Sequence, residues 1–219
     1  KGATVKYTFI GDVHGKYDRY KKIMKSCTNS IQVGDMGVGF RHYIGHDVGK
    51  PFPNPPYDHM VAGNHRFIRG NHDNPATCRS HTQWIQDGRT ETTDLGNKMM
   101  FIGGAFSIDR AWRNENYDWW ADEELSHAEL YSMMDLYLEF KPDIVVTHDC
   151  PSSVADIIFA DDMRYGKFNS RTGSALESMF ASHQPKTWLF GHWHLSKNET
   201  INGTNFICLA ELETLQLDV

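Results

Sequence analysis

The sequence predicts a layered fold of helices and sheets, an α/β or α+β sandwich, and three observations support this. Apolar runs with the length of buried strands alternate with helical patterns over most of the chain, which favours sheets with helices packed on them. The last segment, residues 197–219, alternates polar and apolar residues around Asn202-Gly203, a strong hairpin signal. At 219 residues, the chain has the length of one domain with an inserted lid.

The individual elements follow from the periodicity of the apolar residues. In the first half of the chain we expect strands at residues 4–11, 30–34, 66–70 and 98–103, and a helix at 16–27. A longer helix is expected at 123–140, because Leu130, Met133 and Tyr137 lie on one apolar stripe and Pro142 follows its end. Further strands are expected at 143–147 and 188–191, with a helix around 174–181 between them.

Two segments have the composition of long loops. Residues 36–59 are rich in glycine and proline, with Pro51-Phe52-Pro53-Asn54-Pro55-Pro56 at the centre, and this proline density excludes a central strand or a helix interior. Residues 107–122 are irregular and contain three tryptophans, and a loop of that length usually has a function. We therefore predict a single domain over residues 1–219, with loop or lid segments at about 36–62 and 105–122.

Composition limits the partners and the compartment. The formal net charge is −6, whereas proteins that track long nucleic acid carry a basic face, so no long nucleic acid is expected. No apolar run reaches membrane-spanning length and the start does not resemble a secretion signal, so no membrane partner is expected. The four cysteines are widely spaced, which favours reduced thiols and a cytoplasmic location.

Five polar clusters, each placed directly after an apolar run, are the most informative feature of the chain. The clusters are Asp12-Val13-His14, Asp35, Asn71-His72-Asp73, His148-Asp149 and His192-Trp193-His194. Because the C-terminal ends of strands line one crevice in open sheets, we expect the clusters to converge. Their mixture of Asp, His and Asn is what two closely spaced divalent metals need.

Each cluster taken alone has a simpler explanation, since Asp-x-His and Gly-Asn-His-Asp are also good turn sequences. Gly63-Asn64-His65 competes with the third cluster, but it precedes an apolar run instead of following one. We therefore predict that it lies in a loop. The ordered set of five clusters is what makes a turn-only explanation inadequate.

The set resembles the five sequence blocks of the calcineurin-like metallophosphoesterases, and residues 103–123 resemble a segment of their small bacterial and phage members. The blocks are Gly11-Asp12-Val13-His14-Gly15, Gly34-Asp35-Met36-Gly37, Gly70-Asn71-His72-Asp73, Thr147-His148 and Gly191-His192-Trp193-His194. This resemblance implies an α+β fold, a four-layer α/β/β/α sandwich in which two mixed β-sheets are flanked by helices. It also implies a metal site at the strand C-terminal ends.

The resemblance further implies two metal sites. Asp12, His14, Asp35 and His194 would hold one ion, and Asp35, Asn71, His148 and His192 would hold the other. The shared carboxylate of Asp35 would offset the repulsion between the two cations. Four histidines disfavour Mg²⁺ and Ca²⁺, so we expect two divalent metal ions, with Mn²⁺ (manganese) as the first choice and Fe or Zn²⁺ as alternatives.

The implied chemistry is hydrolysis of phosphate esters by a metal-bridging hydroxide. His72 would stabilise or protonate the leaving oxygen, and Asp73 would orient its imidazole. Arg110 and Arg113 would bind phosphate oxygens. Trp119 or Trp120 would either stack on a base or pack beneath the long loop.

Three functions remain open from the sequence. The first is a phosphatase for a small or peptide-borne phosphomonoester, which we favour because nearby arginines can bind a dianionic terminal phosphate. The second is a phosphodiesterase acting on nucleotides or cyclic nucleotides, and the third is an inactive metal-binding scaffold. Gly37-Val38-Gly39-Phe40 replaces the Arg-Gly that follows the second block in protein phosphatases, and Asp73 stands where they usually have Glu. Both departures disfavour a protein phosphatase, so the expected partner is a small phosphorylated substrate, with nucleotides as candidates.

Overall fold

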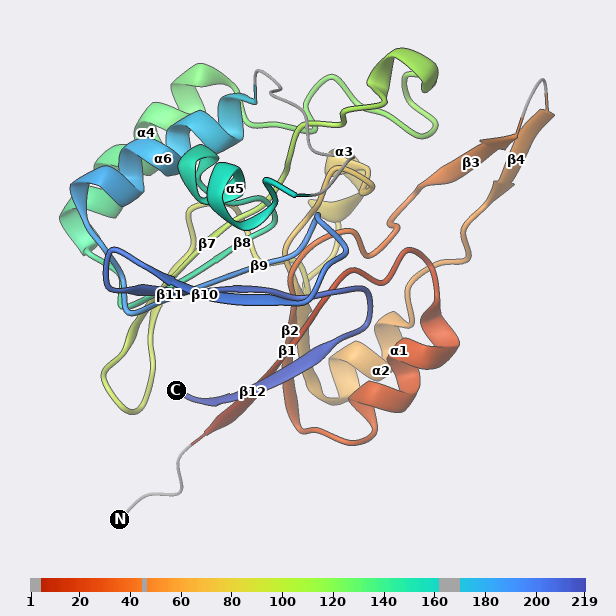
Figure 1. Cartoon of the computed structure of the whole chain (residues 1–219). Helices are drawn as coiled ribbons and strands as arrows, with labels where there is room; N and C mark the ends of the chain where they lie inside the picture. Colours follow the sequence, from red (N-terminus) through yellow and green to blue (C-terminus); the bar gives the residue numbers. More distant parts are fainter. Residues whose placement is uncertain (1–4, 45–46, 162–169) are drawn as a thin grey trace.

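Two mixed β-sheets lie face to face with helices on both outer sides, as the sequence predicted (Figure 1). The computed structural model describes residues 5–44, 47–161 and 170–219. No helix in these ranges has the length and apolarity needed to cross a membrane.

The first sheet contains the N-terminal strands and the C-terminal strand. Its order is β12 (Thr214–Asp218), β1 (Lys6–Ile10), β2 (Asn29–Gln32) and β5 (Asn64–Phe67). The last three are parallel, and β12 is antiparallel to β1. Helices α1 (Tyr17–Met24) and α2 (Tyr57–Ala62) cover the outer face, where Tyr20 and Met60 pack against Ile10 and Phe67.

The second sheet has six strands. Their order is β10 (Lys197–Ile201), β11 (Thr204–Cys208), β9 (Thr187–Phe190), β8 (Ile144–Thr147), β7 (Lys98–Ile102) and β6 (Thr90–Thr92). The four central strands are parallel and the two outer pairs are antiparallel. Helices α4 (His127–Phe140), α5 (Ser152–Ile158) and α6 (Arg171–Ser182) pack on the outer face.

Alternation along the strands separates the core into layers. On β7, Met99 and Phe101 belong to the cluster between the two sheets, while Met100 and Ile102 belong to the cluster under the helices. Both sets are fully or almost fully buried, because side chains of neighbouring strand residues point to opposite faces. The central part of the sheet is thus covered on both sides, which explains why β7, β8 and β9 are apolar runs.

The long helix begins later than predicted. Ser126 caps α4 by accepting from Glu129 N, and the Glu129 side chain bonds back to the backbone of Ser126, a capping box that fixes the first turn. The helix therefore starts at His127 and not at residue 123. It ends at Phe140, followed by Lys141 in the left-handed conformation and then Pro142.

The predicted loop at 36–59 is wrong in part. Strands β3 (Arg41–Ile44) and β4 (Asp47–Pro51) pair as a two-stranded ribbon that extends beyond the sheets (Figure 1), and α2 begins directly after Pro56. Proline excludes only central strands, whereas here it ends a ribbon and precedes a helix. The prediction of a loop at 63–65 is also wrong, because Asn64 and His65 belong to β5.

The other long segment agrees with its prediction. Within 107–122 the structure has a single short 3₁₀ helix, η1 (Arg110–Trp112). The short helix α3 (Pro75–Cys78), which the sequence did not predict, is capped by Asn74.

Candidate metal centre

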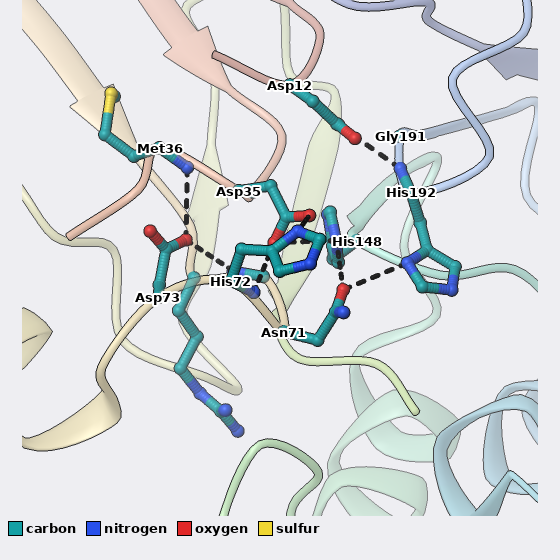
Figure 2. Close-up of polar contacts among 12 residues, drawn as sticks. Asp12, Asp35, Met36, Asn71, His72, Asp73, His148, Gly191 and His192 are labelled. Atoms are coloured by element: carbon teal, nitrogen blue, oxygen red, sulfur yellow. Dashed lines mark hydrogen bonds and ion pairs between the residues drawn. The ribbon is translucent and has the colours of Figure 1, made fainter. Parts of the chain in front are cut away.

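The five polar clusters meet at one place between the sheets (Figure 2). Three of them follow β1, β2 and β5 of the first sheet, and two follow β8 and β9 of the second. The clusters therefore converge as their places at strand ends predicted, but the crevice lies between two sheets and not along the edge of one.

Two glycines let the clusters approach this closely. A Cβ atom at Gly70 would overlap Asp35 Oδ1, and one at Gly34 would overlap the His148 ring. Gly34 also has a φ of +102°, which an L side chain rarely adopts. The residue before each of these clusters must therefore be glycine for the polar groups to meet.

Strained backbone is concentrated in the same residues. His14, Asp35, His192 and His194 all lie in the left-handed region, with φ values of 46°, 58°, 67° and 56°. Such conformations cost free energy in residues other than glycine and persist where the surroundings hold them, often at functional sites. The four strained residues are all members of the two predicted donor groups.

The first predicted donor group is assembled. The ligand atoms of Asp12, His14, Asp35 and His194 lie within 4.8 Å of one another. His194 Nε2 is 3.1 Å and His14 Nε2 is 3.6 Å from Asp12 Oδ2. Neither contact has the geometry of a hydrogen bond, so this buried oxygen has no hydrogen-bond partner among the described residues, and burying a carboxylate oxygen without one is costly. A cation held by the group would satisfy it.

The second predicted donor group shares Asp35 with the first, and Figure 2 shows its members Asp35, Asn71, His148 and His192 together. Asn71 Oδ1 is 3.1 Å from His148 Nε2 and 3.0 Å from His192 Nδ1. His148 Nδ1 lies 2.9 Å from the Val33 carbonyl oxygen, to which it donates. That bond fixes the tautomer and leaves Nε2 as the ligand atom, the usual arrangement for a metal-binding histidine.

Asp35 belongs to both groups. Its Oδ1 is 3.3 Å from His148 Nε2, and its Oδ2 is 3.8 Å from His14 Nε2. Burial alone would raise the pKa of this carboxyl group, but its interactions with the neighbouring His72 and His148 imidazoles outweigh burial and hold the pKa well below the ordinary value. Asp35 is therefore an anion placed between the two groups.

The histidines of the second group differ in protonation. Burial lowers the pKa of His192 to about 4, so its ring is neutral at pH 7. Burial also opposes the charge on His148, but Asp35 overcomes this and raises the pKa of His148 to about 10. A cation bound here would displace that proton, because a metal-binding imidazole is neutral. The carboxylate, imidazole and amide donors of both groups fit Mn²⁺, Fe or Zn²⁺.

His72 lies at the edge of the two groups. Its backbone N–H donates to Asp35 Oδ1 at 2.7 Å, and its ring Nδ1 is 2.6 Å from Asp35 Oδ2. The Arg113 guanidinium donates to the other ring nitrogen, Nε2. Burial lowers the pKa of His72, so the ring is neutral and its Nε2 faces Arg113.

Asp73 has a different structural role from the one predicted. Its carboxylate accepts from the backbone N–H groups of Met36 at 3.2 Å, Gly37 at 2.7 Å, Val38 at 2.8 Å and Gly70 at 2.8 Å. The His72 imidazole is oriented by Asp35 and Arg113 instead. Asp73 points the other way because it ties the loop after β2 to the loop after β5, which carry Asp35 and Asn71.

Replacing Asp73 with asparagine is expected to lower the free energy of unfolding by about 1–3 kcal/mol, the cost of leaving buried backbone donors unpaired. The asparagine amide would present N–H groups to donors that now meet an oxygen. Urea unfolding of the metal-free protein measures this. As a control, exposed Asp94→Asn should change the free energy by no more than about 0.5 kcal/mol, and an equal loss in both variants would contradict the role given to Asp73.

Of the two predicted phosphate-binding arginines, one contacts His72 and the other lies exposed on an aromatic ring. Arg113 is 11% exposed, forms an ion pair with Asp109 at 2.7 Å and reaches His72. Arg110 is exposed and its guanidinium lies 4.4 Å from the centre of the Phe106 ring. Trp120 is buried and its ring centre lies 6.1 Å from that of Phe40, which favours packing beneath the loop over stacking on a base.

Sequence reasoning missed two residues behind the second group. Ser107 Oγ accepts from Asn71 Nδ2 at 2.9 Å and donates to Glu123 Oε2 at 2.5 Å. Both residues are buried. Neither stands in a polar cluster after a strand, so the pattern that located the ligands gave no reason to single them out.

Comparison with known families agrees with the resemblance found in the sequence. A family model described as Metallophos, calcineurin-like phosphoesterase, matches residues 5–196. No curated protein matches the sequence significantly.

Several solved structures have the same fold at low sequence identity. The protein TT1561 of Thermus thermophilus has a TM-score of 0.55 and 13% identity, with 99% of this chain and 95% of that chain covered. The phosphopantetheinyl hydrolase PptH from Mycobacterium tuberculosis has a TM-score of 0.60 and 10% identity, covering 99% and 97%. A putative 5′-nucleotidase from Staphylococcus aureus has a TM-score of 0.54 and 12% identity, covering 98% of this chain and 50% of that chain.

Proposed function

The chain belongs to the calcineurin-like phosphoesterase family, and from this premise we propose that it hydrolyses small phosphomonoesters with two divalent metal ions. Mn²⁺ is the proposed metal, with Fe or Zn²⁺ as alternatives. The observation that supports the proposal most is the place of Asp35, whose two oxygens face separate donor groups. A carboxylate with a purely structural role would not need a histidine facing each of its oxygens, whereas a carboxylate shared by two metal ions would.

We propose Asp12, His14, Asp35 and His194 as ligands of one ion, and Asp35, Asn71, His148 and His192 as ligands of the other. When bound, two such ions supply an activated water and neutralise charge on the phosphoryl oxygens. The protein contributes a rigid donor set, because the strand ends are fixed by both sheets.

His72 is the proposed catalytic residue that is not a ligand. Its Nδ1 is held by Asp35. When Arg113 turns to the substrate, Nε2 is released to take up a proton and donate it to the leaving oxygen. This assignment differs from a ligand role because Nε2 points to Arg113, away from both donor groups. Asp73 supports the site indirectly, through the two loops that it joins.

The predicted lid segments supply the proposed wall of the substrate site. Arg41 N donates to the Tyr117 carbonyl at 3.0 Å, which joins the segment at 36–62 to the segment at 105–122. Phe40 lies edge-on to the His72 ring, with centres 5.0 Å apart. We propose that this wall closes around a terminal phosphate within a single domain of residues 1–219.

We propose Arg113 as the main phosphate-binding side chain. On binding substrate, its guanidinium would turn from His72 to a phosphate oxygen, where it makes charge-assisted hydrogen bonds. Arg113→Ala is expected to cost about 1.5–3 kcal/mol, or roughly tenfold to a hundredfold in kcat/KM for a monoester. Arg110→Ala is the matched control and should have the smaller effect, since Arg110 lies over Phe106. Steady-state kinetics decide this, and a larger loss in the Arg110 variant would reverse the assignment.

The substrate class is tested by turnover of the Mn²⁺-loaded protein on p-nitrophenyl phosphate and on bis-p-nitrophenyl phosphate. We expect a preference for the monoester. A preference for the diester would support the second candidate, a phosphodiesterase acting on nucleotides or cyclic nucleotides. Absence of turnover on both, with metal bound, would support an inactive scaffold. One structural neighbour is named as a putative 5′-nucleotidase, so nucleoside monophosphates are the first nucleotides to assay.

We also propose the cytoplasm as the compartment. The four cysteines are free thiols, and three of them are buried. Free thiols are the usual state of cysteine in a reducing environment.

A further inference from the structure

A buried chain of hydrogen bonds leads away from the second donor group. Asn71 Nδ2 donates to Ser107 Oγ at 2.9 Å, and Ser107 Oγ donates to Glu123 Oε2 at 2.5 Å. The backbone N–H of Ser107 donates to the other carboxylate oxygen at 3.0 Å. The three residues are only 2%, 1% and 2% exposed, so water does not compete for these bonds.

The number of hydrogens in this chain determines the orientation of the Asn71 amide. Glu123 uses both carboxylate oxygens as acceptors. The Ser107 hydroxyl has one hydrogen, which it gives to Glu123, so it can only accept from Asn71. Asn71 must therefore turn its NH₂ toward Ser107. Its oxygen then faces His148 and His192, as Figure 2 shows.

This orientation matters because an amide oxygen and nitrogen have nearly the same shape. Rotating the amide by half a turn would keep the packing of Asn71 but would direct two hydrogens at the second donor group. A cation is bound by the oxygen and repelled by the hydrogens. The hydrogen bonds to Ser107 and Glu123 thus select the amide orientation in which Asn71 can bind a metal ion.

The segment that carries Glu123 is anchored to the same loop after β5 that carries Asn71. Buried Arg69 donates from Nη1 to the carbonyl oxygens of Glu123 at 2.7 Å and Asp122 at 3.1 Å. Its Nε donates to Asp87 at 2.8 Å. Because Arg69 precedes Asn71 by two residues, movement of the Glu123 segment relative to Asn71 is restricted.

We propose that Ser107 and Glu123 are positioning residues that fix the Asn71 amide and thereby set the affinity of the second metal ion. The inference rests on the proposed function to the extent that a divalent ion binds between Asp35, Asn71, His148 and His192. It adds two residues that touch neither ion nor substrate. Substituting either residue is expected to weaken the binding of one of the two metal ions and to leave the other unchanged.

The test is calorimetric titration of the metal-free protein with Mn²⁺ alone, for the wild type, Ser107→Ala and Glu123→Gln. We expect two binding events in the wild type and a loss of about 10- to 100-fold in affinity for one of them in each variant, the usual cost of removing a group behind a metal ligand. In Glu123→Gln the new amide would donate to the Ser107 hydroxyl, which would then donate to Asn71 and favour its wrong orientation. Melting of the metal-free variants checks that they fold.

Two further variants separate positioning from general damage. Ser107→Thr keeps the hydroxyl and should keep the wild-type affinity. Glu124→Gln changes another buried carboxylate, which accepts from Thr172 N at 2.9 Å and Ser170 Oγ at 3.1 Å at the start of α6, and should bind Mn²⁺ like the wild type.

The inference is overturned if Ser107→Ala and Glu123→Gln bind both ions as tightly as the wild type. It is also overturned if Ser107→Thr loses as much as Ser107→Ala, or if Glu124→Gln weakens binding equally. Wild-type protein that binds neither Mn²⁺ nor, in the same titration, Fe²⁺ or Zn²⁺ would refute the proposed function and this inference together. Two ions in the wild type and in every variant, bound with unchanged affinity, would refute this inference alone.

Discussion

Asp35→Asn is expected to abolish most metal binding and turnover, the largest effect of any single substitution in this protein. The fully buried carboxylate faces His14 with one oxygen and His148 with the other. Asparagine has one acceptor oxygen and no charge, so it cannot serve two cations or offset their repulsion. Removing a group behind a metal ligand costs about 10- to 100-fold in affinity, and we expect a shared ligand to exceed the upper end of this range for both ions.

Metal content after dialysis, measured by emission spectroscopy, and turnover of the same samples test this prediction. Asp118→Asn is the matched control, because Asp118 is also a buried aspartate but accepts from Asn114 N at 2.6 Å within the long loop. It should retain wild-type metal content. An Asp35→Asn protein that keeps two ions per chain would contradict the shared role of this carboxylate.

His72→Ala is expected to bind metal like the wild type but to turn over about 10²- to 10⁴-fold more slowly, the usual contribution of a general acid or base. Metal binding and turnover should respond differently because the His72 ring contacts Asp35 and Arg113 but belongs to neither donor group. The loss should be greater for phenyl phosphate than for p-nitrophenyl phosphate, since a poorer leaving group depends more on the donated proton.

His65→Ala provides the control for this prediction. His65 belongs to the similar Gly63-Asn64-His65 segment, is buried, and bonds to Ser30 at 2.8 Å. Its removal should leave turnover unchanged at saturating metal. A metal-free His72→Ala protein would show that His72 is a ligand, and the roles proposed here would be wrong.

The strands and their polar ends could be predicted from the sequence because both depend on local pattern. Buried strands are apolar runs, and the residues that end them must be glycine or polar to turn and approach each other, as at Gly34 and Gly70. Helices α1, α4 and α6 followed from periodicity, whereas the resemblance supplied the two sheets and the helical layers that flank them; α2 and α5 were not predicted. The helix boundary at Ser126 was missed because Leu125, the residue before the cap, extended the apolar stripe.

Other features depend on contacts between distant segments and left no local pattern. Asp73 follows His72 directly, so a bond between them was the simplest expectation. Its carboxylate oxygens instead accept from backbone N–H groups of a loop that includes Val38, 35 residues earlier in the sequence. The bond between Ser107 and Glu123 spans 16 residues and closes only when the long loop folds. The ribbon of β3 and β4 was hidden by the prolines at its end.

The most direct test of the dinuclear centre is a titration of metal-free protein with Mn²⁺ in which bound metal and monoester turnover are measured on the same samples. We expect two ions per chain, turnover that rises with the second ion, and loss of turnover on chelation. Binding of one ion or none, or turnover that persists after the chelator has removed the metal, would contradict a centre built on Asp35 and its two donor groups.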